Sequence, residues 1–429
     1  MAWHTLPTEM KLLIVGSLGK DDLESFSRVD QRTYQACVPA KFRVVKLSTL
    51  QALERFLDSV PREYFTHIEE LDLATVDEPN APYTPTSRAR ADPIISLLAA
   101  TPRLSKLSLK IEGSMDKSIV APFPYLRNLR DLNISNCGDE SLSPLSERLV
   151  VSIAASLQNL EVLSLDNISR SQYHAIDLEG NPDIPVVVGD VDIPDHPLLG
   201  SELALPSLLR IPTLRKLTLR DTHLGDERWT TTPVACRLEV LDLGSYVRAD
   251  EDFNSMCTQR IMAAVGPSVA EFSLATAVSD NLFAKPTDTP LHRLRKLHIS
   301  PFFPVDSVVD TVSNLAGSPI EMLSMQCFEE DVVDVCSALE GFLSVRVERG
   351  PHFFDKLKRI DVTVAATQDA FEPTIEESEE RAAAAERLQS FCRDLQLSSF
   401  VVDTPTPDCV KPVTSFTDAK RSKTRSMTI

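Results

Sequence analysis

A six-residue pattern, apolar-x-x-apolar-x-apolar, returns ten times along the chain. In each copy the last three positions alternate apolar, polar, apolar, which is the two-residue period of a strand with one buried face. The pattern therefore predicts ten short, half-buried β-strands. The copies begin at Ile68, Leu104, Leu129, Leu160, Leu214, Leu238, Val269, Leu294, Ile320 and Leu357.

Segments with helical spacing separate many of these copies. Around Val305, apolar residues fall at i, i+3, i+4, i+7 and i+10, which gives one apolar face. Alternating strands and helices predict an α/β chain built from stacked strand-helix units, an irregular solenoid. A doubly wound sheet or an eight-fold barrel is the alternative with the same alternation. The predicted helices cover residues 92–100, 143–157, 258–265, 305–315 and 331–339.

The repeat varies in length. Successive copies start 36, 25, 31, 54, 24, 31, 25, 26 and 37 residues apart. The 54-residue interval contains residues 169–205, where prolines and aspartates cluster and favour loop over regular structure. We expect a loop excursion there, with one strand around residues 175–178.

Residues 6–47 predict three short helices rather than a repeat strand. In the first helix an apolar face combines Met10, Leu13, Ile14 and Leu18 with Ser17. A bundle this small buries little apolar surface, so it needs to pack against either the repeats or a partner. The boundary signals are Pro7 in the first turn, Gly19 as a stop, Asp21 and Asp30 as N-caps, and Pro39 as the end of the third helix.

The carboxy-terminal end predicts one more helix and then a tail. Residues 373–397 are rich in glutamate and alanine, which have high helix propensity. We expect a capping helix within residues 366–400 and a disordered tail over residues 401–429, where Thr, Pro, Ser and Lys dominate. The apolar face of the helix comprises Ala384, Leu388, Phe391, Cys392 and Leu395.

Composition narrows the class of protein. The chain has 429 residues, 43% hydrophobic and 25% charged, so it is long enough and apolar enough to bury a large core. A net charge of −18 predicts repulsion of DNA and RNA, so no nucleic acid partner is expected. No apolar run approaches the roughly 20 residues that cross a bilayer, and no membrane association is expected. We expect a cytoplasmic protein, with the nucleus as the alternative compartment.

The sequence carries no recognisable catalytic motif. It lacks G-x-G-x-x-G, G-x-x-x-x-G-K-[ST] and G-x-S-x-G, and its eight cysteines are scattered without a C-x-x-C pair. The cysteines are interpreted as reduced, mostly buried thiols. We therefore predict no catalytic residue, no metal and no cofactor.

Polar positions between the strand leucines predict a recognition surface. In stacked strand-helix units these positions face one concave side. Acids and bases are mixed there, which favours a protein target over a polyphosphate. The candidate substrate-binding residues are Glu70, Asp72, Lys106, Lys110, Asp131, Asp166, Lys216, Arg220, Asp242, Glu271, Lys296, His298, Arg359 and Asp361.

The copies resemble leucine-rich repeats. The segment LRDLNISNC follows the family pattern L-x-x-L-x-L-x-x-N/C through Leu129, Leu132, Ile134 and Cys137. The other nine copies lack the asparagine or cysteine at the ninth position. Divergent repeats of this kind resemble those in large fungal families of F-box proteins with leucine-rich repeats.

The first 45 residues resemble an F-box. The matching residues are Leu6, Pro7 and Glu9, then Ile14, Leu18, Asp22, Leu23, Ser27 and Val29, in the family's order. The chain departs after Val29, where family members usually carry Cys-Lys-Arg-Trp. The resemblance implies docking on the Skp adaptor of a cullin-RING ubiquitin ligase through Leu6, Pro7, Ile14, Leu18 and Leu23. A helical cap on the solenoid without an adaptor is the alternative.

These observations predict a non-enzymatic, SCF-type substrate receptor: an F-box over residues 1–45 and a leucine-rich-repeat-like solenoid over residues 46–365. The F-box would bind the adaptor and the repeats would bind a protein target. The alternatives are a leucine-rich interaction scaffold with no role in ubiquitin transfer and a degenerate α/β hydrolase or transferase.

Overall fold

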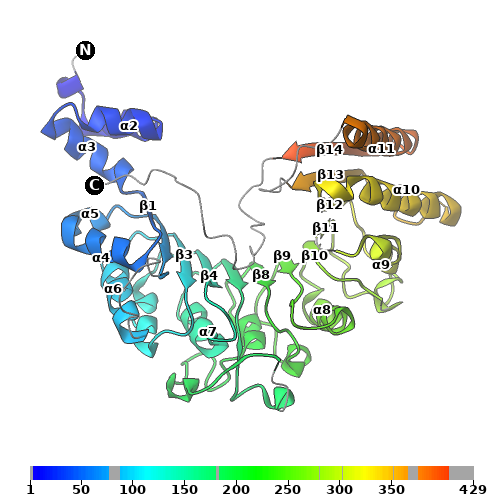
Figure 1. Ribbon diagram of the computed structural model, residues 1–429, viewed down its shortest axis with the longest axis horizontal. Coiled ribbons are helices and arrows are strands. Elements are labelled where there is room, and N and C mark those ends of the chain that lie inside the picture. The colour runs from blue at the N-terminus through cyan, green and yellow to red at the C-terminus, as the bar shows by residue number, and fades with distance from the viewer. Residues whose placement is uncertain are drawn as a thin grey trace. The chain divides into compact units, whose positions relative to one another are not determined.

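The computed structural model describes residues 3–76, 87–179, 183–279, 281–301, 303–350, 352–365 and 375–404 (Figure 1). The chain is α/β, as predicted, and the strands of its main sheet pair in parallel. It divides into two compact units. The first comprises Met1–Arg295 with Asn314–Pro319, and the second comprises Lys296–Ser313 with Ile320–Ile429.

The first unit begins with a bundle of three helices, as predicted: α1 (Thr8–Gly16), α2 (Lys20–Ser27) and α3 (Gln31–Lys41). Both α1 and α2 pack on α3. Asp30 caps α3 by accepting the Thr33 N–H at 2.8 Å.

Two predicted boundaries of the bundle are wrong. The N-cap of α2 is Gly19, so Asp21 lies in the first turn, where its charge still favours the helix dipole. Helix α3 continues through Pro39 to Lys41, because a proline this close to the helix end removes few intrahelical hydrogen bonds.

Within the described part of the first unit, eight strands of the main sheet follow one another in parallel. Seven come from copies of the six-residue pattern, and β1 (Val44–Leu47) precedes them in a segment for which we predicted helices alone. The others are β2 (Glu70–Ala74), β3 (Lys106–Ile111), β4 (Asp131–Asn136), β5 (Val162–Asp166), β8 (Lys216–Arg220), β9 (Val240–Leu243) and β10 (Glu271–Leu274).

The strand register explains why the leucines recur. Leu71, Leu107 and Leu132 are paired across β2, β3 and β4, and the ladder continues to Phe272 on β10. A second ladder runs parallel to it from Leu73 to Leu274, and both ladders are fully buried. Burial of each large apolar side chain stabilises the fold by about 1.5–3 kcal/mol, so in-register stacking is the main source of cohesion.

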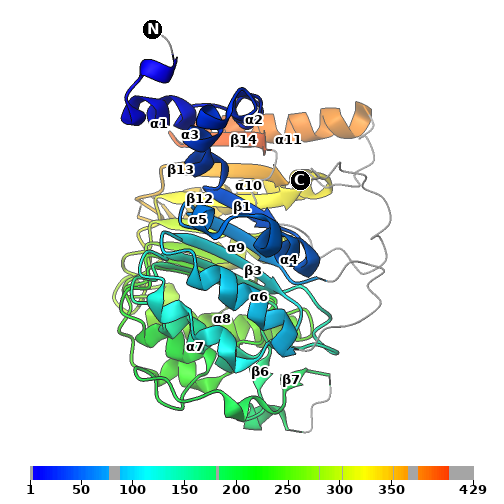
Figure 2. The ribbon, with the colours of Figure 1, turned by 90° about the vertical axis from the view of Figure 1, so that its left-hand side faces the viewer.

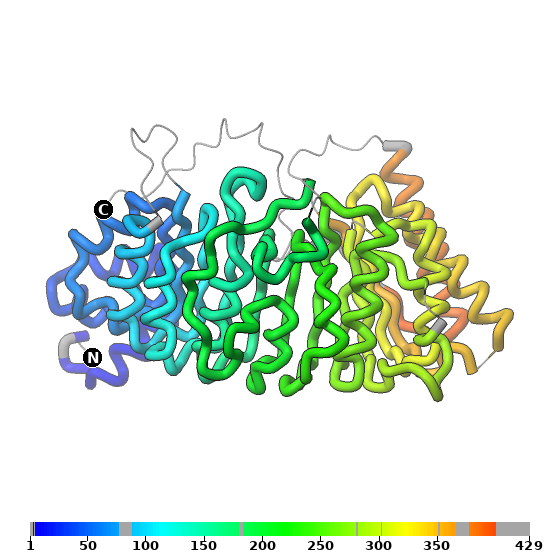
Figure 3. The backbone as a smooth tube through the Cα atoms, turned by 90° about the horizontal axis from the view of Figure 1, so that it is seen from below, coloured from blue at the N-terminus to red at the C-terminus, as the bar shows by residue number. Residues whose placement is uncertain are grey.

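Helices α4, α6, α7 and α8 lie on one side of the strands of the first unit (Figure 1). Successive turns of the chain run side by side through this unit (Figure 3). The predicted helices at 92–100, 143–157 and 258–265 correspond to α6, α7 and α8. The segments between β3 and β4 and between β8 and β9 contain short 3-10 turns instead of α-helices. The α-helices described after the bundle in this unit are α4 (Leu50–Ser59), α5 (Arg62–Phe65), α6 (Ser87–Ala99), α7 (Glu147–Ala155) and α8 (Glu251–Val265).

The second unit contains β11 (Lys296–Ile299), β12 (Met322–Phe328), β13 (Arg359–Ala365) and β14 (Ser398–Thr404), paired in that order. Its helices are α9 (Val308–Asn314), α10 (Val332–Arg349) and α11 (Ile375–Asp394). These helices confirm the last three helical predictions. Ala384, Leu388 and Cys392 of α11 are buried, and α11 packs on α10 and β14.

Strand β14 was not predicted. It includes residues 401–404, which we assigned to a disordered tail, and its parallel pairing with β13 supplies the ladder hydrogen bonds that order it. The remainder of the predicted tail, residues 405–429, lies outside the described residues.

The excursion after β5 is largely irregular, as predicted. It contains two short paired strands, β6 (Arg170–Ser171) and β7 (Val186–Val187), which are visible in Figure 2. The expected strand at residues 175–178 is wrong. Ile176–Leu178 forms a 3-10 turn, because no neighbouring strand pairs with it.

Candidate functional site

Helix α1 presents an apolar stripe to solvent. It buries Val15 alone, while Met10, Leu13 and Ile14 lie at i, i+3 and i+4 on the opposite side and are exposed. Leu13 is 70% exposed. We call Pro7, Met10, Leu13 and Ile14 the α1 stripe. Among the predicted adaptor-binding residues, Pro7 and Ile14 lie in it, whereas Leu6, Leu18 and Leu23 are half-buried.

Helix α1 packs on α3 and buries Val15, and the residues just before α1 are tied to the other two helices. The Trp3 ring packs edge-on against Phe26 with a centroid distance of 4.8 Å, and its indole N–H donates to the Thr33 hydroxyl at 3.1 Å. An apolar stripe on an anchored helix is the arrangement that a helix-docking partner recognises.

The strand register brings the predicted substrate-binding residues of the first unit together in three rows. The first row contains Glu70, Lys106, Asp131, Lys216 and Glu271; the second contains Asp72 and Asp242; the third contains Lys110, Asp166 and Arg220. In the second unit, Lys296 shares a row with Arg359, and His298 shares a row with Asp361. Except for Asp361, all of these side chains are exposed or half-buried.

Several of these charges neutralise one another across strands. The Nζ of Lys106 lies 3.4 Å from Asp131, and the Nζ of Lys110 lies 3.6 Å from Asp72. The Arg220 guanidinium pairs with Asp242 at 2.7 Å. Such pairs offset part of the charge on the strand face.

Asp361 departs from the expected exposed position. It is buried on β13 between β12 and β14, and its carboxylate accepts a hydrogen bond from the Arg359 guanidinium at 2.7 Å.

At the carboxyl ends of these strands, two loops are joined. The Arg248 guanidinium lies 3.2 Å from Glu140 and donates to the Ser141 hydroxyl at 2.8 Å. The Tyr246 hydroxyl donates to Glu140 at 3.1 Å. The joined loops expose Leu142 and Val247, which are 82% and 81% accessible. This rim was missed in the sequence because the two loops are separated by more than 100 residues.

Two carboxylates lie close to this rim. Burial and then the neighbouring Asp221 carboxylate raise the pKa of Asp166 to about 6. Burial also raises the pKa of Asp221, which accepts the Val247 N–H at 3.3 Å. The rim therefore combines the partly buried carboxylates of Asp166 and Asp221 with exposed aliphatic side chains.

A buried polar network joins the excursion to α7. The Glu147 carboxylate is fully buried and accepts the backbone N–H groups of Ser171 at 3.0 Å and Leu205 at 3.1 Å. Burial raises the pKa of Glu147 to about 7, against the opposing effect of Arg170. The Arg170 guanidinium lies 2.7 Å from Asp177 and 3.8 Å from Asp226.

The imidazole of His223 lies near this network. It is buried against Tyr246 and Phe253, and its Nδ1 accepts the Gly225 N–H at 3.4 Å. Burial, assisted by the charge of Arg170, lowers the pKa of His223 from 6.5 to about 4. The folded protein therefore holds this ring neutral while the unfolded chain protonates it.

This shift makes His223 a source of acid sensitivity. Because the pKa of His223 is lower in the folded state, protonation of the unfolded chain destabilises the fold in acid. The neutral ring has no such cost above pH 6.5, and stability is lost as the pH falls toward about 4. The free energy of unfolding, measured with urea at several pH values in this range, should fall less steeply with decreasing pH in His223→Gln than in wild type. The two slopes against pH should differ by up to about 1.4 kcal/mol per pH unit. Equal slopes would contradict a buried neutral imidazole.

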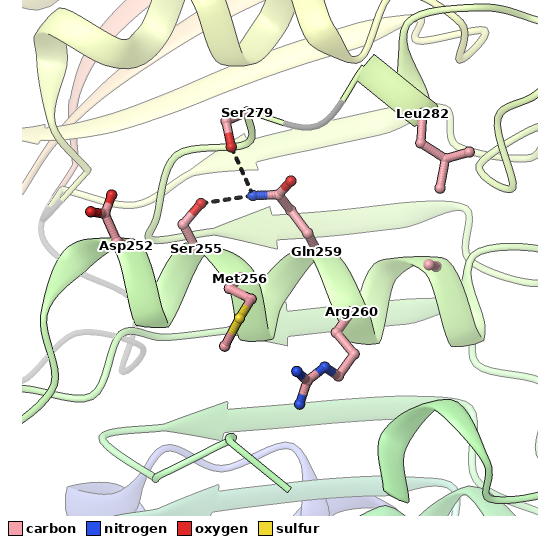
Figure 4. A pocket seen from close by; sticks show the side chains of 8 residues that line it. Asp252, Ser255, Met256, Gln259, Arg260, Ser279 and Leu282 are labelled. Atoms are coloured by element: carbon pink, nitrogen blue, oxygen red, sulfur yellow. Dashed lines mark hydrogen bonds between the residues drawn. The ribbon is translucent and has the colours of Figure 1, made fainter. Parts of the chain in front are cut away.

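A groove of about 590 Å³ follows one side of α8 (Figure 4). In it, the Gln259 amide donates to Ser255 at 2.8 Å and to Ser279 at 3.3 Å, and Ser255 in turn donates to the Ala277 carbonyl. Its lining residues do not pair a nucleophile with a base, so the groove offers no catalytic arrangement. The lining residues are Asp252, Ser255, Met256, Gln259, Arg260, Ala263, Ser279 and Leu282.

Other classes of site receive no support from the described ranges. Within them, no group of three or more His, Cys, Asp or Glu side chains is arranged to hold a metal ion. The cysteines found there are free thiols, and all but Cys137 are buried, as predicted. No helix in those ranges combines the length and apolar character needed to cross a bilayer.

Comparison with known proteins yields neither a matching family nor a matching curated relative.

Proposed function

We propose that this protein is the substrate-recognition subunit of an SCF-type cullin-RING ubiquitin ligase. The helices α1–α3 would act as an F-box that binds the Skp adaptor. The strand-helix turns after them would act as a leucine-rich-repeat solenoid that binds a protein target. The observation that supports this most strongly is the exposed α1 stripe on a bundle matching the F-box residue order.

The stripe favours a docking role over a capping role. A helix that only capped the repeats would turn its apolar face inward, whereas α1 buries Val15 and exposes Met10, Leu13 and Ile14. Burying side chains of this size against a partner stabilises a complex by about 1.5–3 kcal/mol each, before the cost of association. A few such anchors supply most of the affinity of a protein interface.

No catalytic group is required of the chain in this role. Ubiquitin transfer would be performed by separate components, and this protein would raise the effective concentration of the target near them. Mixed charge on the strand rows and the exposed rim at Leu142 and Val247 suit a protein target.

The proposal is tested by adaptor capture with a matched variant. Immobilised, purified Skp adaptor should retain the full-length chain and should lose a triple variant, Leu6→Ala, Pro7→Ala and Ile14→Ala, that keeps its circular dichroism. Failure to retain the folded wild-type chain would favour a leucine-rich scaffold with no role in ubiquitin transfer.

A further inference from the structure

The excursion after β5 has an unusual composition. Between Arg170 and Arg210 the sequence contains no lysine or arginine over 39 residues. The same segment carries seven carboxylates: Asp177, Glu179, Asp183, Asp190, Asp192, Asp195 and Glu202. Apart from Asp190, those side chains are exposed. The surface of the excursion is therefore strongly negative.

This segment also exposes large apolar side chains. It buries Val187, Ile193 and Leu199, yet it turns Val188, Val191 and Leu198 outward beside them. A surface loop that only connected two strands would be expected to place polar residues at these outward positions. The exposed set is Tyr173 at 55%, Ile176 at 73%, Val188 at 72%, Val191 at 65% and Leu198 at 46%.

Buried polar contacts fix the backbone beneath this surface. The Arg148 guanidinium donates to the backbone carbonyls of Asp190, Ile193 and Ser201 at 3.2 Å each. The Asp190 carboxylate accepts the hydroxyls of Ser146 at 2.5 Å and Ser171 at 2.7 Å. Because the excursion is held from inside, its outward apolar side chains are preorganised for a partner, which lowers the entropy cost of binding.

The charge of the excursion indicates the partner's chemistry. On the strand face, acids and bases pair with one another, as in Lys106 with Asp131. Cationic side chains from outside the excursion pair with three of its seven carboxylates: Arg170 with Asp177, Lys117 with Asp192 and Arg210 with Glu202. The negative charge would repel nucleic acid and anionic lipid surfaces. A segment with lysine or arginine next to aliphatic residues would instead pair its cations with the carboxylates and its aliphatic side chains with the exposed apolar ones.

We propose that the excursion is a docking platform for a target segment that carries lysine or arginine beside aliphatic side chains. This inference rests on the proposed function, since it names the class of target that the receptor holds. It places the first contact with the target on Val188, Val191 and the exposed carboxylates of the excursion, in addition to the strand face.

The test uses an array of synthetic peptides that vary independently in charge and in aliphatic content, probed with the labelled full-length chain at about physiological ionic strength. Peptides combining lysine or arginine with leucine or valine should be retained. Their retention should fall at least tenfold for the double variant Val188→Ser and Val191→Ser, and also for Glu179→Gln with Asp195→Asn.

Matched controls remove similar groups elsewhere in the first unit. Tyr125→Ser with Val234→Ser removes exposed apolar side chains, and Glu54→Gln with Asp58→Asn removes exposed carboxylates of α4. Both controls should bind the peptides as wild type does. Three outcomes would overturn the inference: the chain retains no peptide, it retains peptides without enrichment in basic-aliphatic sequences, or the variants and the controls lose binding equally.

Adaptor capture by the same excursion variants separates the two proposals. It should be unchanged, because the excursion and α1 are different surfaces. Peptide binding without adaptor binding would support the docking platform and reject the ligase role. Adaptor binding without peptide binding would support the ligase role and reject the docking platform.

Discussion

Replacing Arg170 by alanine is expected to lower the free energy of unfolding by about 3–5 kcal/mol. The Arg170 side chain is 2% exposed and donates to Asp177 and to the His174 carbonyl at 2.9 Å. It also offsets the charge of fully buried Glu147. Removing the guanidinium takes the compensating positive charge away from fully buried Glu147 and breaks the pair with Asp177, whereas Asp226 keeps its pair with Arg228 at 2.6 Å.

The control is a second arginine that pairs with a carboxylate near the surface. Arg210 is 29% exposed and lies 3.1 Å from Glu202, which is 66% exposed. Arg210→Ala should cost about 1–2 kcal/mol, because solvent screens the pair with Glu202 and the guanidinium also donates to the carbonyls of Leu198 and Leu199. Urea unfolding of both variants measures the difference. Equal losses would mean that the network beneath the excursion contributes no more than a surface ion pair.

Placing charge on the α1 stripe is expected to abolish adaptor binding. In the double variant Leu13→Asp and Ile14→Asp, two side chains that are exposed in the free protein become carboxylates that the partner would have to desolvate. Affinity for the adaptor should fall at least about 100-fold, which corresponds to about 2.7 kcal/mol. Because neither position is buried, stability should change by less than about 1 kcal/mol.

Leu12 supplies the matched control on the same helix. It is 43% exposed but lies off the stripe. Leu12→Asp adds the same kind of charge to α1 and should leave adaptor affinity within about threefold of wild type. A comparable loss in Leu12→Asp would show that the acidic charge of the helix, rather than the stripe, governs binding.

The strands were predictable because their signal is local. The two-residue period identified every strand from β2 to β5 and from β8 to β13, since each buries one face on its own turn of the chain. The same six-residue pattern occurs in Phe42–Leu47 and in residues 397–402, which form β1 and β14. The first of these copies adjoins the predicted helical bundle and the second adjoins the predicted tail. The composition of those neighbouring segments therefore favoured helix and disorder over strand.

The buried network could not be predicted. Arg148, Arg170, Asp190 and Asp226 come from segments separated by up to 78 residues, and each reads in the sequence as an ordinary exposed charge. Proline and aspartate in the excursion indicated a loop, but its inner contacts depend on tertiary partners. The α1 stripe lies between these cases, because periodicity located the apolar face and the structure was needed to show that it points to solvent.

The most direct test of the ligase role is a calorimetric titration of the full-length chain with purified Skp adaptor. The proposed function predicts a one-to-one complex with a dissociation constant of about 1 µM or tighter, equivalent to about −8 kcal/mol. Binding of that strength, lost in the Leu13→Asp and Ile14→Asp variant, would support an F-box role for α1–α3. Absence of binding by a folded wild-type chain would contradict it.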